Sequence, residues 1–86
     1  MNEISIFKAL SNPTRIKILE LVERNEKCIC EIIPETGRSQ PTISQHLKIL
    51  KDAQLIKQRK EGTNIWISTP NKKIFSIIDN TRRITE

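Results

Sequence analysis

The fold is decided by one stretch of the sequence, Ser39-Gln40-Pro41-Thr42-Ile43-Ser44-Gln45-His46-Leu47-Lys48-Ile49-Leu50. Ser39 is a favourable N-cap, and a proline is tolerated in the first turn of a helix. Three apolar residues recur at i, i+4 and i+7, which is the spacing of one helix face: Ile43, Leu47 and Leu50. The stretch therefore predicts a helix with one buried and one exposed face.

A shorter helix is predicted just before this stretch. It begins near Ile29 and ends at Gly37, a residue type that suits the position after a helix C-terminus. Only the residues from Thr36 to Ser39 separate the two helices, which predicts a helix-turn-helix. The exposed face of the second helix carries side chains that suit base edges and phosphates, namely Gln40, Thr42, Ser44, Gln45, His46 and Lys48.

Two more helices are predicted upstream. The first covers the apolar residues from Ile4 to Leu10 and is stopped by Ser11-Asn12-Pro13. The second begins at Pro13 and runs to about Arg24. A polar break, Asn25-Glu26-Lys27, then precedes the helix-turn-helix.

Downstream of Asp52 the apolar period changes from 3.6 to 2. The runs 55–60 and 65–68 flank Glu61-Gly62-Thr63-Asn64, which predicts a β-hairpin with a basic projecting end. Thr69-Pro70-Asn71 then ends the strand, and a last helix follows with three apolar residues on one stripe, Ile74, Ile77 and Ile78. The predicted fold is mainly α with a β-hairpin wing, a winged helix-turn-helix, in one domain over residues 1–86.

Charge and composition narrow the classes of function. The net charge is +5, and residues 38–60 contain six Lys/Arg against Asp52 alone, so a compact basic stripe predicts a polyanion partner.

No apolar run is long enough for a transmembrane helix or a secretory signal, so we expect a cytoplasmic protein with no membrane partner. Two cysteines make no disulfide scaffold, and a reducing cytosol predicts free thiols. One His without a convergent nucleophile or carboxylate leaves nothing for an active site, so we expect no enzyme.

Three ordered motifs resemble the ArsR/SmtB family of small metal- or signal-responsive repressors. They are Phe7 to Leu19, which is similar to the family's opening signature, Ser39 to Leu50, similar to its recognition helix, and Lys60 to Trp66, similar to its wing. The resemblance covers roughly residues 4–70. It implies a homodimer, formed by the N-terminal and last helices, that binds a palindromic double-stranded DNA operator and leaves it when an effector binds.

The resemblance also assigns residues. It implies that Gln40, Pro41, Ser44 and Gln45 are the base-reading positions. The resemblance, the polar helix face and the basic wing together predict the DNA-binding residues. These are Ser39, Gln40, Pro41, Thr42, Ser44, Gln45, His46, Lys48, Lys51, Arg59, Lys60, Thr63 and Asn64. Two departures matter: Gln54 stands where members usually have Gly, so it is expected in an αL conformation, and the last helix lacks the His residues of the family's zinc site there.

The pair Cys28 and Cys30 resembles the Cys-x-Cys of the family's arsenic- and cadmium-type sensors. No cofactor is required, but two thiolates suit As(III), Cd(II) or Cu(I) as an effector. Redox sensing is a second interpretation, in which the strain of a bridge between residues i and i+2 favours a disulfide between protomers. Structural cysteines in a tight turn are the third. The sequence thus predicts a repressor with an effector site at this pair, and the alternative is an effector-independent regulator or a protein-interaction module.

Overall fold

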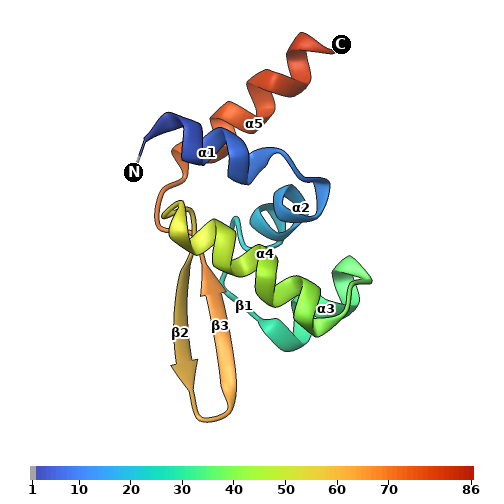
Figure 1. The fold of residues 1–86 in the computed structure, drawn as a ribbon, viewed down its shortest axis with the longest axis vertical. Coiled ribbons are helices and arrows are strands. Elements are labelled where there is room, and N and C mark those ends of the chain that lie inside the picture. The colour runs from blue at the N-terminus through green and yellow to red at the C-terminus, as the bar shows by residue number, and fades with distance from the viewer. Residues whose placement is uncertain (1) are drawn as a thin grey trace.

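A computed structural model describes residues 2–86, which form five helices and three short strands (Figure 1). The elements follow in the order α1 (Glu3–Leu10), α2 (Pro13–Leu21), β1 (Lys27–Cys28), α3 (Ile29–Thr36), α4 (Gln40–Asp52), β2 (Lys57–Glu61), β3 (Asn64–Ser68) and α5 (Lys73–Ile84). The expected winged helix-turn-helix order is confirmed. Among the described residues no helix combines the length and the apolar character needed to cross a membrane.

Capping residues set the helix boundaries. The Asn12 side chain accepts hydrogen bonds from the backbone N–H groups of Thr14 (2.8 Å) and Arg15 (3.2 Å), so α2 begins at Pro13. Ser39 caps α4 as predicted, and Gly37 ends α3 with a left-handed φ of 68°. One prediction was too long: α2 ends at Leu21 rather than near Arg24, and the backbone N–H of Val22 closes its last turn.

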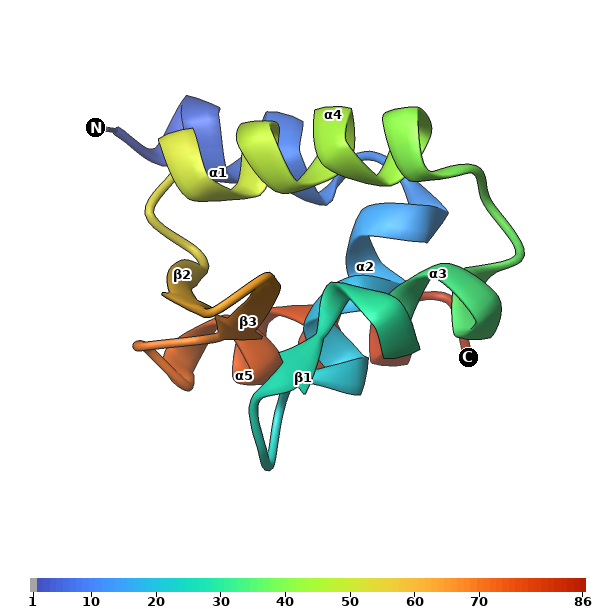
Figure 2. The ribbon, with the colours of Figure 1, turned by 90° about the horizontal axis from the view of Figure 1, so that it is seen from below.

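The core lies between α2, α3 and α4 and the sheet. Its aliphatic side chains come from every helix, and those almost fully enclosed are Ile18, Leu19, Val22, Ile32, Ile43, Leu47, Leu50 and Ile67. In Figure 2, α1 and α4 lie along one side of the fold, and the sheet and α5 lie on the other. The core therefore holds α4 by one face and leaves its other face free.

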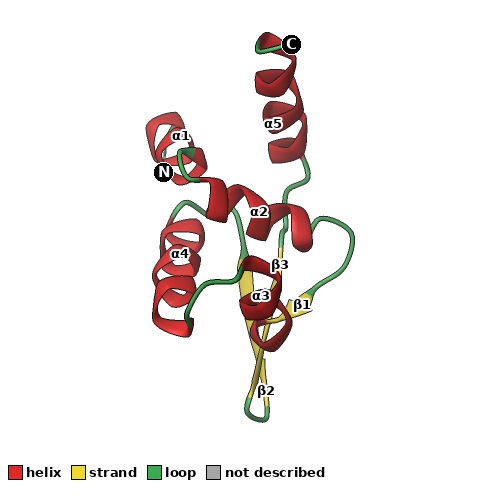
Figure 3. Ribbon diagram, turned by 90° about the vertical axis from the view of Figure 1, so that its right-hand side faces the viewer, coloured by secondary structure: helices red, strands yellow, loops and turns green. Residues whose placement is uncertain are grey.

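The sheet has one strand more than the sequence predicted. β2 and β3 form the expected antiparallel hairpin, and β1 pairs with β3 as well, so the strand order is β1-β3-β2. The hairpin, residues 57–68, is called the wing below. It points away from the body at the end opposite α5 (Figure 3). A strand of two residues is too short to show the alternation of apolar and polar residues that signals a strand. The sequence around Lys27 was therefore interpreted as a polar break.

Helices α1 and α5 leave apolar side chains uncovered. Ile4, Phe7 and Ile77 are 54%, 58% and 38% exposed. Ile74 and Ile78 lie on the same predicted stripe as Ile77, but each is only 3% exposed and packs into the core with Phe75. The uncovered apolar surface of these two helices is therefore Ile4, Phe7, Ile77 and Ile84.

The junction between α4 and the wing contains the predicted backbone strain. Gln54 has a φ of 62°, in the left-handed region that a glycine adopts at lower cost. Two backbone hydrogen bonds of 2.9 Å hold this junction, from Gln54 N to Lys51 O and from Leu55 N to Leu50 O. They fix the direction in which the chain leaves α4 for β2.

Candidate nucleic-acid interface

Helix α4 presents the predicted polar face to solvent. Five of its candidate residues are exposed, namely Gln40, Pro41, Ser44, Gln45 and Lys48, while the apolar face packs into the core. Ser39 and Thr42 have a structural part as well. The Ser39 hydroxyl accepts from the Thr42 backbone N–H (3.4 Å) and donates to the Thr42 hydroxyl (3.0 Å), so both help to begin the helix.

His46 is tied to the rest of the helix bundle by Arg15. The Arg15 guanidinium donates from Nη1 to His46 Nδ1 at 3.0 Å and from Nε to the Ala9 carbonyl at 2.7 Å. Since a guanidinium only donates, Nδ1 must accept, and the proton of the neutral ring is on Nε2. Burial, and then the charges of Arg15 and Arg38, lower the pKa of His46 below its ordinary value of 6.5. The contacts make Arg15 a structural residue that holds α4 against α1 and α2.

The lysines of α4 remain on the surface. Lys48 Nζ lies 3.1 Å from Asp52, and the two side chains are 76% and 65% exposed. This i,i+4 ion pair is therefore weak, and Lys48 can leave Asp52 for another anion. Lys51 is exposed as well. Both cations therefore border the same solvent-facing side as the polar residues of α4.

The wing carries the other predicted contacts. Lys60, Thr63 and Asn64 are exposed around its turn, where Gly62 adopts a φ of 61°. Arg59 differs from them, because its guanidinium contacts two carboxylates, Glu26 at 2.6 Å and Glu61 at 2.5 Å. It also lies 5.8 Å from the centre of the Trp66 ring. Hydrogen bonds to Glu26 and then Glu61 raise the pKa of Arg59 above its ordinary value.

The cysteine pair occupies the junction of β1 and α3. Cys28 is the N-cap of α3, where its sulfur accepts from the Cys30 backbone N–H at 3.1 Å. Glu31 accepts in turn from the Cys28 backbone N–H at 3.2 Å, which completes a capping box. Cys28 is buried, at 3% exposure, and Cys30 is exposed. Chemical access to the pair is therefore through Cys30.

The structure joins Cys28 to Cys30 in a disulfide, so the predictions of free thiols and of a disfavoured internal bridge were wrong here. The reason is the backbone of Cys28, which is extended (φ −71°, ψ 147°) rather than helical. That conformation places the two Cα atoms 5.1 Å apart, within the range of disulfides. Among the described residues no group of three or more His, Cys, Asp or Glu side chains is placed to hold a metal ion.

A pocket of about 240 Å³ connects the cysteine pair with the predicted DNA-binding face. Its lining includes Cys28 and Cys30 from the start of α3, Gln40 from the first turn of α4, and Thr63 and Asn64 from the wing. Residues that are distant in sequence are thus brought around one opening.

Sequence reasoning missed the residues that hold these groups in place. Glu26 and Glu61, which pair with Arg59, were treated as loop residues, and the contact between Arg15 and His46 was not predicted. Glu26 and Arg59 are 33 positions apart, and Arg15 and His46 are 31 apart. No spacing within one helix or strand signals a contact across such a separation.

A polar recognition helix, the turn before it and a basic wing define a winged helix-turn-helix DNA-binding domain. The sequence profile of the bacterial regulatory proteins of the arsR family matches residues 12–58, more than half of the chain. The protein belongs to this family of transcription regulators.

Individual relatives agree with this assignment. An uncharacterised HTH-type transcriptional regulator of Methanocaldococcus jannaschii is 47% identical over 78 residues, which span 86% of this chain and 88% of that protein. An arsenical resistance operon repressor of Staphylococcus aureus is 37% identical over 88% of this chain and 73% of its own length. The solution structure of a homodimeric winged helix-turn-helix DNA-binding domain from Mycobacterium bovis covers 95% of this chain and 76% of that one. It has a TM-score of 0.81 at 27% identity.

Proposed function

We propose that the protein is a homodimeric repressor that binds a palindromic duplex DNA operator through α4 and the wing. The observation that carries the proposal is the exposed polar face of α4, fixed from behind by Ile43, Leu47 and Leu50. Amide and hydroxyl side chains on such a face suit base edges in the major groove. A docking groove for a protein partner would instead place apolar residues there.

Roles are proposed for each part of this surface. The base-reading residues are Gln40, Pro41, Ser44 and Gln45, and proline offers only apolar contact. Phosphates are contacted by Lys48, Lys51, Lys60 and His46, whose Nε2–H is the ring donor left by Arg15. Thr63 and Asn64 extend the contact from the wing, and Ser39 and Thr42 support the first turn of α4.

Dimerisation follows from the uncovered apolar surface of α1 and α5. Ile4, Phe7 and Ile77 are side chains that a second copy would cover. The homodimeric M. bovis domain, which shares the fold, supports this assembly. Two recognition helices related by a two-fold axis then address half-sites about 34 Å apart.

Two substitutions test the DNA-binding surface on a duplex selected from a random-sequence pool by the wild-type protein. Lys60→Ala is expected to weaken binding to all duplexes alike and to lower the slope of log K against log salt by about 1. Gln40→Ala is expected to cost about 1–3 kcal/mol on the selected duplex and little on a scrambled one, because a base contact is lost. Fluorescence anisotropy over a range of salt concentrations measures both effects.

The surface would be assigned wrongly if both variants bound the selected duplex like the wild type. A third variant, Lys17→Ala, controls for the loss of a cation. Lys17 is exposed on α2, outside the proposed surface, and its substitution should leave the affinity and the salt slope unchanged.

The cysteine pair is the proposed effector site. In its reduced form, two thiols replace two hydroxyls of arsenous acid, forming two As–S bonds and releasing two waters; Cd(II) or Cu(I) would displace two protons instead. Because the described residues offer no third ligand, the remaining position falls to an outside thiol. The arsenical resistance repressor of S. aureus, at 37% identity, supports arsenic as the first ion to test.

Arsenite is expected to lower the affinity of the reduced protein for the selected duplex by about 5–150-fold, a typical allosteric coupling. The double variant Cys28→Ser/Cys30→Ser should bind DNA normally and show no response. The measurement is a DNA titration with and without arsenite, Cd(II), Cu(I) or an oxidant. Identical responses of wild type and double variant to all four would make the cysteines structural.

A further inference from the structure

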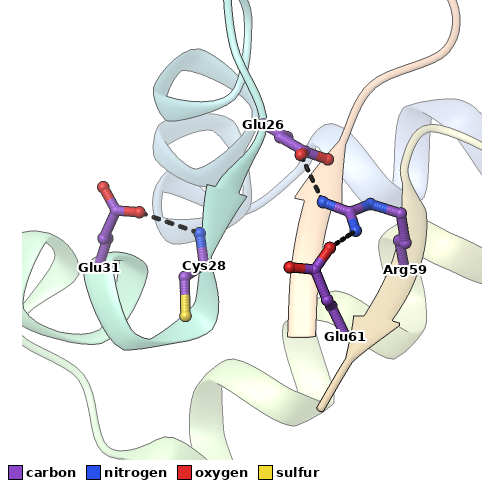
Figure 4. Close-up of polar contacts among 5 residues, drawn as sticks. All are labelled: Glu26, Cys28, Glu31, Arg59 and Glu61. Carbon is purple, nitrogen blue, oxygen red and sulfur yellow. Dashed lines mark hydrogen bonds and ion pairs between the residues drawn. The ribbon is translucent and has the colours of Figure 1, made fainter. Parts of the chain in front are cut away.

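The contacts of Arg59 join three separate segments of the chain. Its guanidinium pairs with Glu26, which lies between α2 and β1, and with Glu61, at the end of its own strand (Figure 4). Its cation also lies near the face of Trp66 on β3. Planar guanidinium groups are suited to such simultaneous contacts, which fix both the position and the orientation of the side chain.

We propose that Arg59 is a positioning residue, which fastens the wing to the segment that carries the cysteine pair and transmits the state of that pair to the wing. The proposal rests on the effector role of Cys28 and Cys30 given above. It replaces the sequence-based prediction that Arg59 contacts a phosphate.

The charges around Arg59 argue against a phosphate contact. One cation and two carboxylates within 2.6 Å of its nitrogens give the cluster a net charge of −1. A phosphate approaching this guanidinium would meet both Glu26 and Glu61. Lys60, the next residue, has no ion pair among residues 2–86 and is exposed, so it remains a free cation on this strand.

The register of the sheet supplies the path from the cysteines. Trp66 on the central strand pairs with Cys28 on one side and with Arg59 on the other. Arg59 and Trp66 share a face of the sheet, where the guanidinium lies 5.8 Å from the ring centre, and Cys28 stands opposite Trp66 on the other side of the central strand. β1 contains only two residues, Lys27 and Cys28, and a change at Cys28 therefore alters half of its pairing with β3.

Glu26 provides a second connection that runs outside the sheet. It lies two residues before Cys28, and its carboxylate reaches Arg59 at 2.6 Å. Drawing both thiolates of the reduced pair onto one ion moves the chain between Glu26 and α3. The wing then moves with it through Arg59, and the spacing between wing and recognition helix no longer matches the DNA.

The first experiment separates positioning from phosphate contact. Arg59→Ala is expected to weaken binding to the selected duplex while the slope of log K against log salt stays that of the wild type. Lys60→Ala, the neighbouring cation, lowers the slope by about 1. An equal loss of slope in Arg59→Ala would overturn the proposal.

The second experiment tests transmission with a matched pair of variants. Glu26→Gln removes the carboxylate that faces Arg59, and Glu23→Gln makes the same change in the same loop, where Glu23 has no ion pair within residues 2–86. Arsenite binding to each reduced protein is followed by the fluorescence of Trp66, the single tryptophan, which lies opposite Cys28. Release from the selected duplex is measured in parallel.

Glu26→Gln is expected to bind arsenite with the wild-type midpoint, while the arsenite-induced loss of DNA affinity falls to less than a third of the wild-type loss. Glu23→Gln should behave as the wild type in both measurements. Full release in Glu26→Gln would overturn the transmission role. A wild type that neither binds arsenite nor releases DNA would remove the effector role and the transmission together, and the salt slopes would still decide whether Arg59 contacts phosphate.

Discussion

Replacing Phe7 with glutamate is expected to turn the protein into a 10.0 kDa monomer and to lower its affinity for a palindromic duplex about 10²–10⁴-fold. Phe7 is 58% exposed within one chain, so the substitution removes little from the core of the monomer. A carboxylate on an apolar contact surface opposes association, because it must lose its hydration. Without the partner, each recognition helix binds a half-site alone and loses the effective concentration that the dimer provides.

Sedimentation velocity and anisotropy on the same sample measure the two effects together. Phe7→Leu serves as the control, since it keeps an apolar side chain at this position and should remain a dimer with wild-type affinity. The proposed assembly would be contradicted by a Phe7→Glu protein that still sediments as a dimer and binds the palindrome normally.

The largest effect on stability is expected for Leu47→Ala. Leu47 is 1% exposed on the inner face of α4, and truncating such a side chain removes its transfer free energy and leaves a cavity. The expected loss is about 2–5 kcal/mol in the free energy of unfolding. A small domain is stabilised by about 5–15 kcal/mol in total. A loss of this size therefore raises the unfolded fraction of the whole domain and is not confined to α4.

Ile49→Ala is the matched comparison on the same helix. Ile49 is 42% exposed, so the same kind of truncation should cost less than about 1 kcal/mol. Urea unfolding at one fixed protein concentration gives both values, since association contributes to the apparent stability. Equal losses for the two variants would mean that α4 is not held by the face described above.

The parts of the fold that the sequence could predict are those with local signals. Helix α4 was predictable because its cap, its proline and its apolar spacing all lie within the thirteen residues of the helix and Ser39 before it. The end of α3 at Gly37 was predictable for a similar reason, as was the left-handed conformation of Gln54 once the resemblance was recognised.

The parts that remained hidden depend on contacts between distant segments. Strand β1 forms only because β3 offers it an edge, and the extended Cys28 that results brings the cysteines into bonding distance. When charges are counted along the sequence, Arg59 is one of the six cations of the basic stripe in residues 38–60. Only the folded chain places Glu26 beside it, which is the contact on which its proposed positioning role rests.

The left-handed backbone at Gln54 has a consequence for the entropy of DNA association. A residue held in this conformation costs about 1–3 kcal/mol, and that cost is incurred when the chain folds. In exchange, the two backbone hydrogen bonds at this junction fix the angle between α4 and the wing before DNA is present. In the proposed complex, α4 and the wing would then meet the DNA with the angle at this junction already set, so little conformational freedom of the junction would remain to be lost on association.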